Sequence, residues 1–150
     1  MPRTCIFCDT SLTGVRAKEH VIAQWLMEYL GLTEDQLYLA VGRSADDTIL
    51  ESRQQVASKF VEGRVCERCN NEWMSHLETE AMEILKLLIA ATASIMSISD
   101  AERTTVAKWA TKTAYVVSHA SPLRKTPDAS HLRYMSQNLG AVPPRVEVFG

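Results

Sequence analysis

The sequence predicts a mixed fold of the α+β class, with strands and helices in separate stretches of the chain. Three observations carry this prediction. Short β-like segments gather in the first half, stretches of helical periodicity fill the second half, and two Cys-x-x-Cys pairs lie far apart. The chain has 150 residues, of which 46% are hydrophobic and 23% charged. This length and composition suit one sizeable core.

The first half is predicted to hold a short helix and a small antiparallel meander. Apolar residues recur with a helical period from Val21 to Leu30, and Gly31 then ends this short helix. Three β-like pieces follow, LYLAV, TILES and KFVEG, with polar stretches between them. We expect these pieces to pair in sequence as a meander.

The second half is predicted to be helical. A helix begins at Asn70 and runs for about 20 residues, judged by its apolar period. The sequence SDAE is a capping box that opens the next helix, which Pro122 closes. Asp128 or Ser130 can cap a last short helix that ends at Gly140. The tail VPPRVEVFG resembles the beginning of a strand.

Composition bears on location and on partners. No apolar run reaches the ~20 residues that a membrane-spanning helix needs. The N-terminus lacks the apolar region of a secretory signal, so we expect a cytoplasmic protein with no membrane partner. The formal net charge is −2, so global charge gives no attraction to nucleic acid.

The four cysteines form two pairs, Cys5-x-x-Cys8 and Cys66-x-x-Cys69. Each pair can span one edge of a tetrahedral Zn²⁺ site, and two pairs complete a closed structural site of four thiolates. A thioredoxin-like redox pair would need a single such motif near a βαβ unit, which the sequence lacks. Two reduced and unligated pairs are the remaining alternative.

Two polar groups lie beside these pairs. Glu19 and His20 are adjacent, and Asn70 directly follows the last cysteine. Adjacent side chains on an extended strand point to opposite faces, so both can serve one site only if the strand ends or twists there. Asn70 can also act as the N-cap of the long helix.

In this order, the motifs resemble the HNH endonucleases stapled by a four-cysteine zinc site, in particular a subgroup of bacteria and phages. The similar stretches are CIFC, EHVIAQWL, VCERCNNEWMSHLE and WATKTA, within residues 5–30 and 65–115. The resemblance implies a ββα-metal core with an inserted meander in residues 1–90. A helical extension of residues 91–150 would pack on this core.

The resemblance also implies roles for individual residues. His20 would be the general base, and Glu19 would bind a divalent ion such as Mg²⁺, Mn²⁺ or Ni²⁺. Asn70 would be the second ligand of that ion, with Asn71 as the alternative. The family more often has Asp at the position of Glu19, and its middle Asn has no counterpart, since no asparagine lies between residues 20 and 70.

The implied function is metal-dependent hydrolysis of DNA phosphodiester bonds. The alternative is a catalytically degenerate, zinc-stapled module that binds nucleic acid or a protein partner, and a third option is a disulfide redox protein. A nuclease of this net charge needs local basic groups, and the acidic stretch Glu72–Glu83 should face away from them. An ordinary solvated surface is the other interpretation of these basic groups. The expected DNA contacts are Lys108, Lys112, Arg124 and Lys125.

Overall fold

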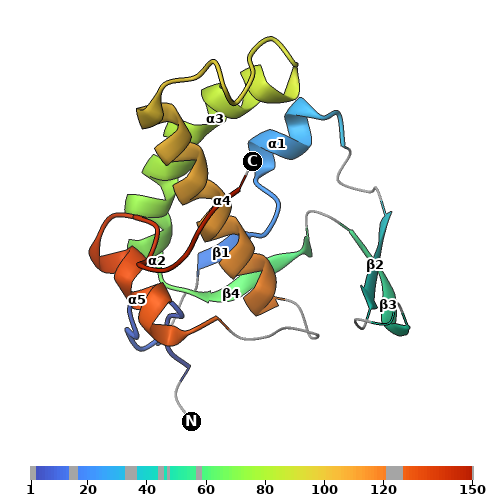
Figure 1. Ribbon diagram of the computed structural model, residues 1–150. Helices are drawn as coiled ribbons and strands as arrows, with labels where there is room; N and C mark the ends of the chain where they lie inside the picture. The colour runs from blue at the N-terminus through green and yellow to red at the C-terminus, as the bar shows by residue number, and fades with distance from the viewer. Residues whose placement is uncertain are drawn as a thin grey trace.

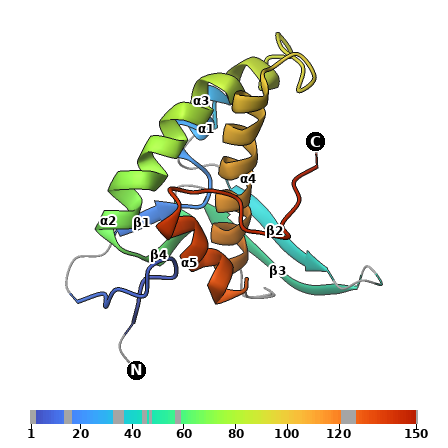
Figure 2. The same ribbon diagram turned by 60° about the vertical axis from the view of Figure 1, so that its left-hand side comes forward.

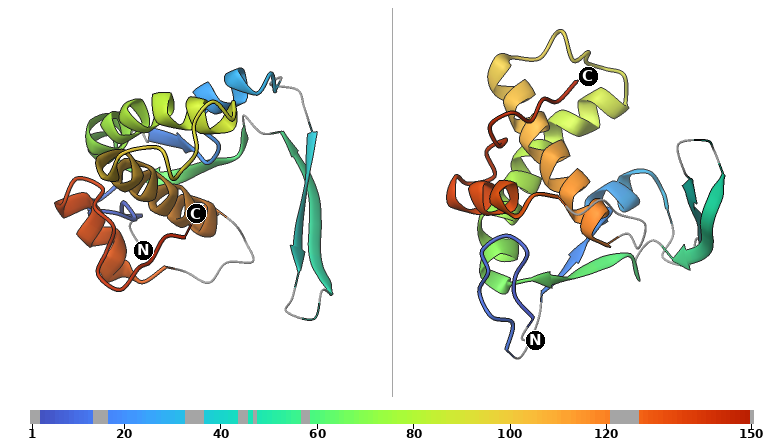
Figure 3. Two further views of the ribbon diagram at one scale, coloured as in Figure 1. Left: turned by 45° about the horizontal axis from the view of Figure 1, so that its top comes forward. Right: turned by 60° about the horizontal axis from the view of Figure 1, so that its bottom comes forward.

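The computed structural model describes residues 3–13, 17–32, 37–43, 46, 48–56, 59–120 and 127–149. Over these residues the protein is mixed α and β, as the sequence predicts, with short antiparallel strands and several helices (Figure 1). The helices pack around the N-terminal segment and one strand pair, and a separate hairpin lies to one side of them (Figure 3).

A two-stranded antiparallel sheet carries the Glu-His pair. Strand β1 (Ala17–His20) pairs with β4 (Val61–Val65), with Glu19 opposite Glu62 and a register shift between Ala17 and Glu19. β1 ends at His20, and the chain bends directly afterwards. The sequence leaves open where this strand ends, and the structure places that end at the Glu-His pair.

The predicted three-stranded meander does not form. Strands β2 (Leu37–Arg43) and β3 (Ile49–Val56) pair with each other as a hairpin. The third predicted piece becomes β4, which pairs with β1 instead. The reason is that β4 leads directly into the second cysteine pair, and the backbone N–H of Ile6 in the first pair donates to the carbonyl of Arg64 in β4 at 2.9 Å.

The long predicted helix forms as one continuous helical segment with three parts, which we call the rod. It consists of α2 (Glu67–Cys69), the π-helical turn η2 (Asn70–Met74) and α3 (Ser75–Ile89). The shorter α1 (Gln24–Tyr29) lies beside α3, and the hydroxyl of Tyr29 donates to the carbonyl of Lys86 at 3.3 Å.

Two more helices complete the body. Helix α4 (Asp100–Ala120) packs along α3, and its predicted capping box forms, with the N–H of Ser99 donating to Glu102 Oε2 at 2.7 Å. Helix α5 (Ala129–Gln137) is capped by Asp128. Within residues 141–149 the structure has no strand, because the chain turns where the N–H of Val146 donates to the carbonyl of Pro143.

One hydrophobic core joins these parts across the boundary between residues 90 and 91. Figure 2 shows α4 lying alongside α3, with α5 near the N-terminal segment. Phe7 of the N-terminal segment meets Trp73 of η2 edge to face, with ring centroids 5.2 Å apart. Helix α5 closes the same core, and the hydroxyl of Ser136 donates to the carbonyl of Phe7 at 2.8 Å. The remaining buried members include Val65, Met74, Leu77, Val116, Leu132 and Met135. In the described part of the chain, no helix is both long and apolar enough to cross a membrane.

Gly140 shows how closely the end of α5 packs on the rod. Its φ is +79°, and a Cβ there would lie 3.1 Å from Leu77 Cδ2 and from Trp73 Cε3. We expect Gly140→Ala to lower the free energy of unfolding by about 2–4 kcal/mol, from left-handed strain plus overpacking. Gly31→Ala is the matched control, because φ is +65° there but no atom lies within 4 Å. If urea unfolding gives equal losses for both variants, the packing part of this argument is wrong.

Candidate metal and catalytic site

The four cysteines converge on one point. Their Sγ atoms all lie within 4.8 Å of one another, and Cys8 Sγ is 3.5 Å from Cys66 Sγ. Four sulfurs around Zn²⁺ at about 2.3 Å each would be about 3.8 Å apart, so the cluster has the right size. All four are free thiols, without a disulfide between them. This cluster could therefore hold a metal ion such as zinc.

The four thiols affect one another's pKa values in a way that favours a bound cation. A hydrogen bond from Cys69 lowers the pKa of Cys5, and the pKa of Cys69 is raised by that same hydrogen bond and by burial. Burial also raises the pKa of Cys66, and the nearby charge of Cys5 adds to this effect. One ionised sulfur thus opposes the ionisation of its neighbours, and a bound cation reverses that opposition.

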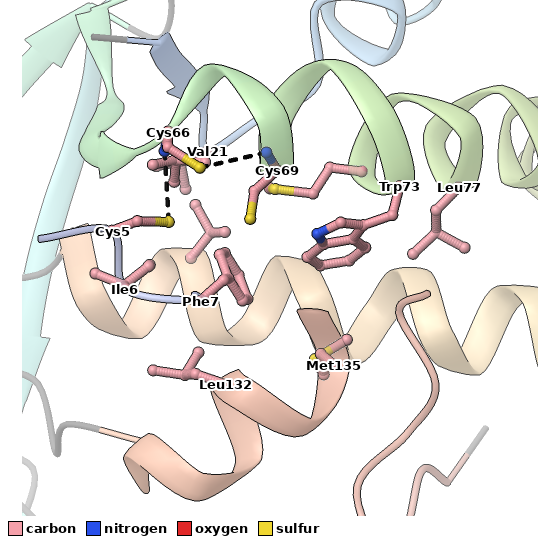
Figure 4. Packing of buried hydrophobic residues seen from close by; sticks show 13 residues of the cluster. Cys5, Ile6, Phe7, Val21, Cys66, Cys69, Trp73, Leu77, Leu132 and Met135 are labelled. Atoms are coloured by element: carbon pink, nitrogen blue, oxygen red, sulfur yellow. Dashed lines mark hydrogen bonds between the residues drawn. The ribbon is translucent and has the colours of Figure 1, made fainter. Parts of the chain in front are cut away.

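The second cysteine pair starts the rod (Figure 4). Cys66 is the N-cap of α2, and its Sγ accepts a hydrogen bond from the N–H of Cys69 at 3.4 Å. Its own N–H donates to Cys5 Sγ at 3.4 Å, which joins the two pairs. The interpretation of Asn70 as the N-cap is therefore wrong, because the helix begins earlier, at Glu67.

Asn70 instead lies in the π-helical turn η2. The carbonyl of Asn70 accepts from the N–H of Ser75, five residues on. Turns of this kind are frequent at functional sites. The side-chain Nδ2 of Asn70 donates to Asn71 Oδ1 at 3.0 Å. Asn70 Oδ1 is buried and accepts no hydrogen bond within the described residues, so it is available to a ligand.

A pocket of about 440 Å³ brings the predicted catalytic residues together. Glu19 and His20 reach it from the end of β1, and Asn70 reaches it from η2. Asn71 is exposed and does not line it. The walls come from β1, α1 and the rod, and the lining residues are Glu19, His20, Ala23, Gln24, Trp25, Glu28, Asn70, Met74, Ser75 and Glu78.

An ion cluster of Glu19, Glu78 and Lys112 borders this pocket, and we call it the buried ion cluster because its lysine is buried, although the Glu19 and Glu78 side chains are 13% and 21% exposed. Lys112 Nζ lies 3.0 Å from Glu19 Oε1 and 2.5 Å from Glu78 Oε1, and the lysine side chain is 3% exposed. Two indole N–H groups complete the coordination of Glu78, from Trp25 to Oε2 at 2.7 Å and from Trp109 to Oε1 at 2.9 Å. Both oxygens of Glu78 are thus occupied.

The ion cluster changes the expected basic surface. Lys112 faces two carboxylates in the interior, whereas the sequence placed it on a solvent-facing rim with Lys108. Glu78 belongs to the acidic stretch expected to face elsewhere, and it approaches Lys112 because burial requires a counter-charge. Lys108 remains partly exposed on α4. Arg124 and Lys125 lie outside the described residues.

Sequence reasoning missed Glu78 and the buried position of Lys112. The one available signal was that Lys112 lies three residues after Trp109, which puts the two side chains on the same face of α4. It also missed a second buried pair, in which His119 Nδ1 lies 3.6 Å from Glu62 Oε2. Burial opposes ionisation of Glu62, but the nearby imidazole of His119 and the hydrogen bond from the N–H of Arg64 outweigh it and lower the pKa of this carboxyl.

Comparisons of the chain with protein-family models, with curated proteins and with solved structures find no match.

Proposed function

We propose that this chain is a metal-dependent endonuclease of the HNH type that hydrolyses DNA phosphodiester bonds. The observation that carries the proposal is the pocket shared by Glu19, His20 and Asn70. Glu19 and His20 come from β1, and Asn70 comes from the η2 turn that follows β4, the antiparallel partner of β1. The four-cysteine cluster lies at the junction of β4 and the rod.

Within this proposal, the four cysteines hold a structural Zn²⁺. Four sulfur ligands leave no open position on the metal, which is the arrangement of structural rather than catalytic zinc sites. Asn70 directly follows Cys69, so fixing this cysteine also fixes the η2 turn. The cluster thereby supports the position of the amide in the pocket.

The residues of the pocket also fit a second, divalent ion. Glu19 and Asn70 offer oxygen atoms, which are the ligands that Mg²⁺ and Mn²⁺ prefer. The buried and unpartnered Oδ1 of Asn70 is the observation that favours an ion there. When bound, such an ion stabilises the charge that develops on the phosphate and on the leaving oxygen.

His20 is the general base of the proposed reaction. Its ring accepts the proton of the attacking water, a step for which histidine is the side chain used most often. The water oxygen then bonds to phosphorus, and the 3′ oxygen leaves with the electron pair of the broken bond. Lys108, with Arg124 and Lys125, is proposed to contact the DNA backbone.

The test is cleavage of a supercoiled plasmid by the zinc-loaded protein with added Mg²⁺, Mn²⁺ or Ni²⁺. We expect nicking that depends on the added ion and a loss of about 100-fold or more in His20→Ala, since general bases contribute that much. The melting temperature should stay close to that of the wild type, because His20 lies at a strand end and is only partly buried.

His76→Ala is the matched control, because His76 is an exposed histidine on α3 outside the pocket. It should cleave like the wild type. A wild type that is inert with every ion would contradict the nuclease proposal and favour a binding module. Equal activity of His20→Ala and the wild type would remove His20 from the mechanism.

A further inference from the structure

We propose that Lys112 is a positioning residue, which holds one oxygen of Glu19 so that the other is presented to the pocket. This inference rests on the proposed function, because it assigns Glu19 the role of an ion ligand. It adds a residue of α4 to a site whose walls come from β1, α1 and the rod, and it gives the buried ion cluster a role in that site.

The geometry of Glu19 is the first step. Its Oε1 is bound by Lys112 Nζ at 3.0 Å, and within the described residues no hydrogen bond reaches Oε2. Glu19 lines the pocket and its side chain is 13% exposed. The side chain is therefore fixed by Lys112 and still accessible from the pocket. One ion pair therefore divides the carboxylate into an anchored oxygen and an available one.

The anchoring of Lys112 itself is the second step. A lysine has a long side chain with many rotamers, and it can position another group only if it is fixed. Glu78 supplies this, since its Oε1 lies 2.5 Å from Lys112 Nζ. Glu78 is in turn held by the indoles of Trp25 and Trp109, so the chain of contacts ends on rigid aromatic side chains.

The length of the Glu19 side chain explains why this support is needed. A glutamate has one more rotatable bond than an aspartate, and each additional torsion adds ways to misplace the carboxylate. The ammonium group of Lys112, bound to Oε1, restricts the rotation of the Glu19 carboxylate. Because Lys112 is positively charged, it also repels a cation near Glu19. Lys112 thus fixes the position of the Glu19 carboxylate more closely, and it lowers the affinity of the site for the cation to some degree.

The experiment compares Lys112→Met with the wild type by two measurements on the zinc-loaded protein, Mn²⁺ affinity from calorimetry and plasmid cleavage at saturating Mn²⁺. We expect the Mn²⁺ dissociation constant to stay the same or fall several-fold. The saturated cleavage rate should fall about 10- to 100-fold, as when an outer partner of a metal ligand is removed. Lys86→Met is the matched control, because Lys86 pairs with Glu83 on the surface. It should leave both quantities unchanged.

The outcomes separate this inference from the proposed function. If the wild type cleaves and Lys112→Met cleaves equally well, only the role of Lys112 is overturned. The same holds if ion affinity falls and saturating Mn²⁺ restores the full rate. If the wild type neither binds Mn²⁺ nor cleaves, the proposed function fails and this inference falls with it.

A second variant keeps the test decisive if Lys112→Met does not fold. Lys112→Met combined with Glu78→Gln removes both charges of the anchoring pair, so no unpaired carboxylate remains at position 78. This double variant should fold, bind Mn²⁺ and show the same loss of saturated rate. A folded double variant with the wild-type rate would overturn the inference.

Discussion

We expect the Cys66→Ser variant to be largely unfolded, because it loses one of the four ligands of the proposed zinc site. Binding of structural zinc contributes about 10–16 kcal/mol, as much as or more than the whole stability of an ordinary domain. Cys66 also has two further roles, because its Sγ caps α2 and its N–H donates to Cys5 Sγ. The measurements are far-UV circular dichroism and the zinc content, which should be one ion per chain in the wild type.

The matched control is Met96→Ser, which removes a sulfur-containing side chain that is 82% exposed. It should keep the helical signal and the zinc. Removal of zinc from the wild type by a strong chelator should reproduce the effect of Cys66→Ser, and added Zn²⁺ should reverse it. A wild type that is fully folded without zinc would instead make the cluster a set of four packed thiols.

Most of the helices were predictable because their signals are local, but the start of the long helix was not, since it begins at Glu67 with Cys66 as its cap rather than at Asn70. The capping box at Ser99 forms as predicted, and of the two candidate caps for the last helix, Asp128 and Ser130, the structure uses Asp128. The partner of β4 was not predictable, because strand pairing joins segments distant in sequence and three consecutive β-like pieces suit a meander equally well. The choice followed from the cysteine pairs, since Arg64 of β4 contacts Ile6 of the first pair.

The candidate site also has one part that the sequence predicts and one part that it does not. The four cysteines could be grouped from spacing alone, because each Cys-x-x-Cys pair is a recognisable half-site. The ion cluster could not, because Lys112 and Glu78 lie on different helices and each residue type is ordinarily exposed. Lys108 and Lys112 are four apart on α4, yet a small rotation of the helix decides that Lys112 faces inward.

A strong energetic coupling between Lys112 and Glu78 is the second large expected effect. Lys112→Met leaves two carboxylates close together without their counter-charge. We expect it to lower the free energy of unfolding by about 3–5 kcal/mol, as when one partner of a buried pair is removed. Glu78→Gln should lose about 1–3 kcal/mol, because Lys112 keeps Glu19 while one of the two indole N–H groups loses its acceptor. The double variant should lose less than the sum of the two.

The coupling energy is measured by urea unfolding of the two single variants and the double variant, all loaded with zinc. We expect about 1–3 kcal/mol, the upper range for groups in contact. Lys86 and Glu83 form the matched pair, because their atoms are 3.0 Å apart but the side chains are 32% and 71% exposed. That surface pair should couple by no more than about 0.5 kcal/mol, since water screens it. Equal coupling in the two pairs would mean that Lys112 and Glu78 are as hydrated as a surface pair, and the buried ion cluster could not hold Glu19 in place.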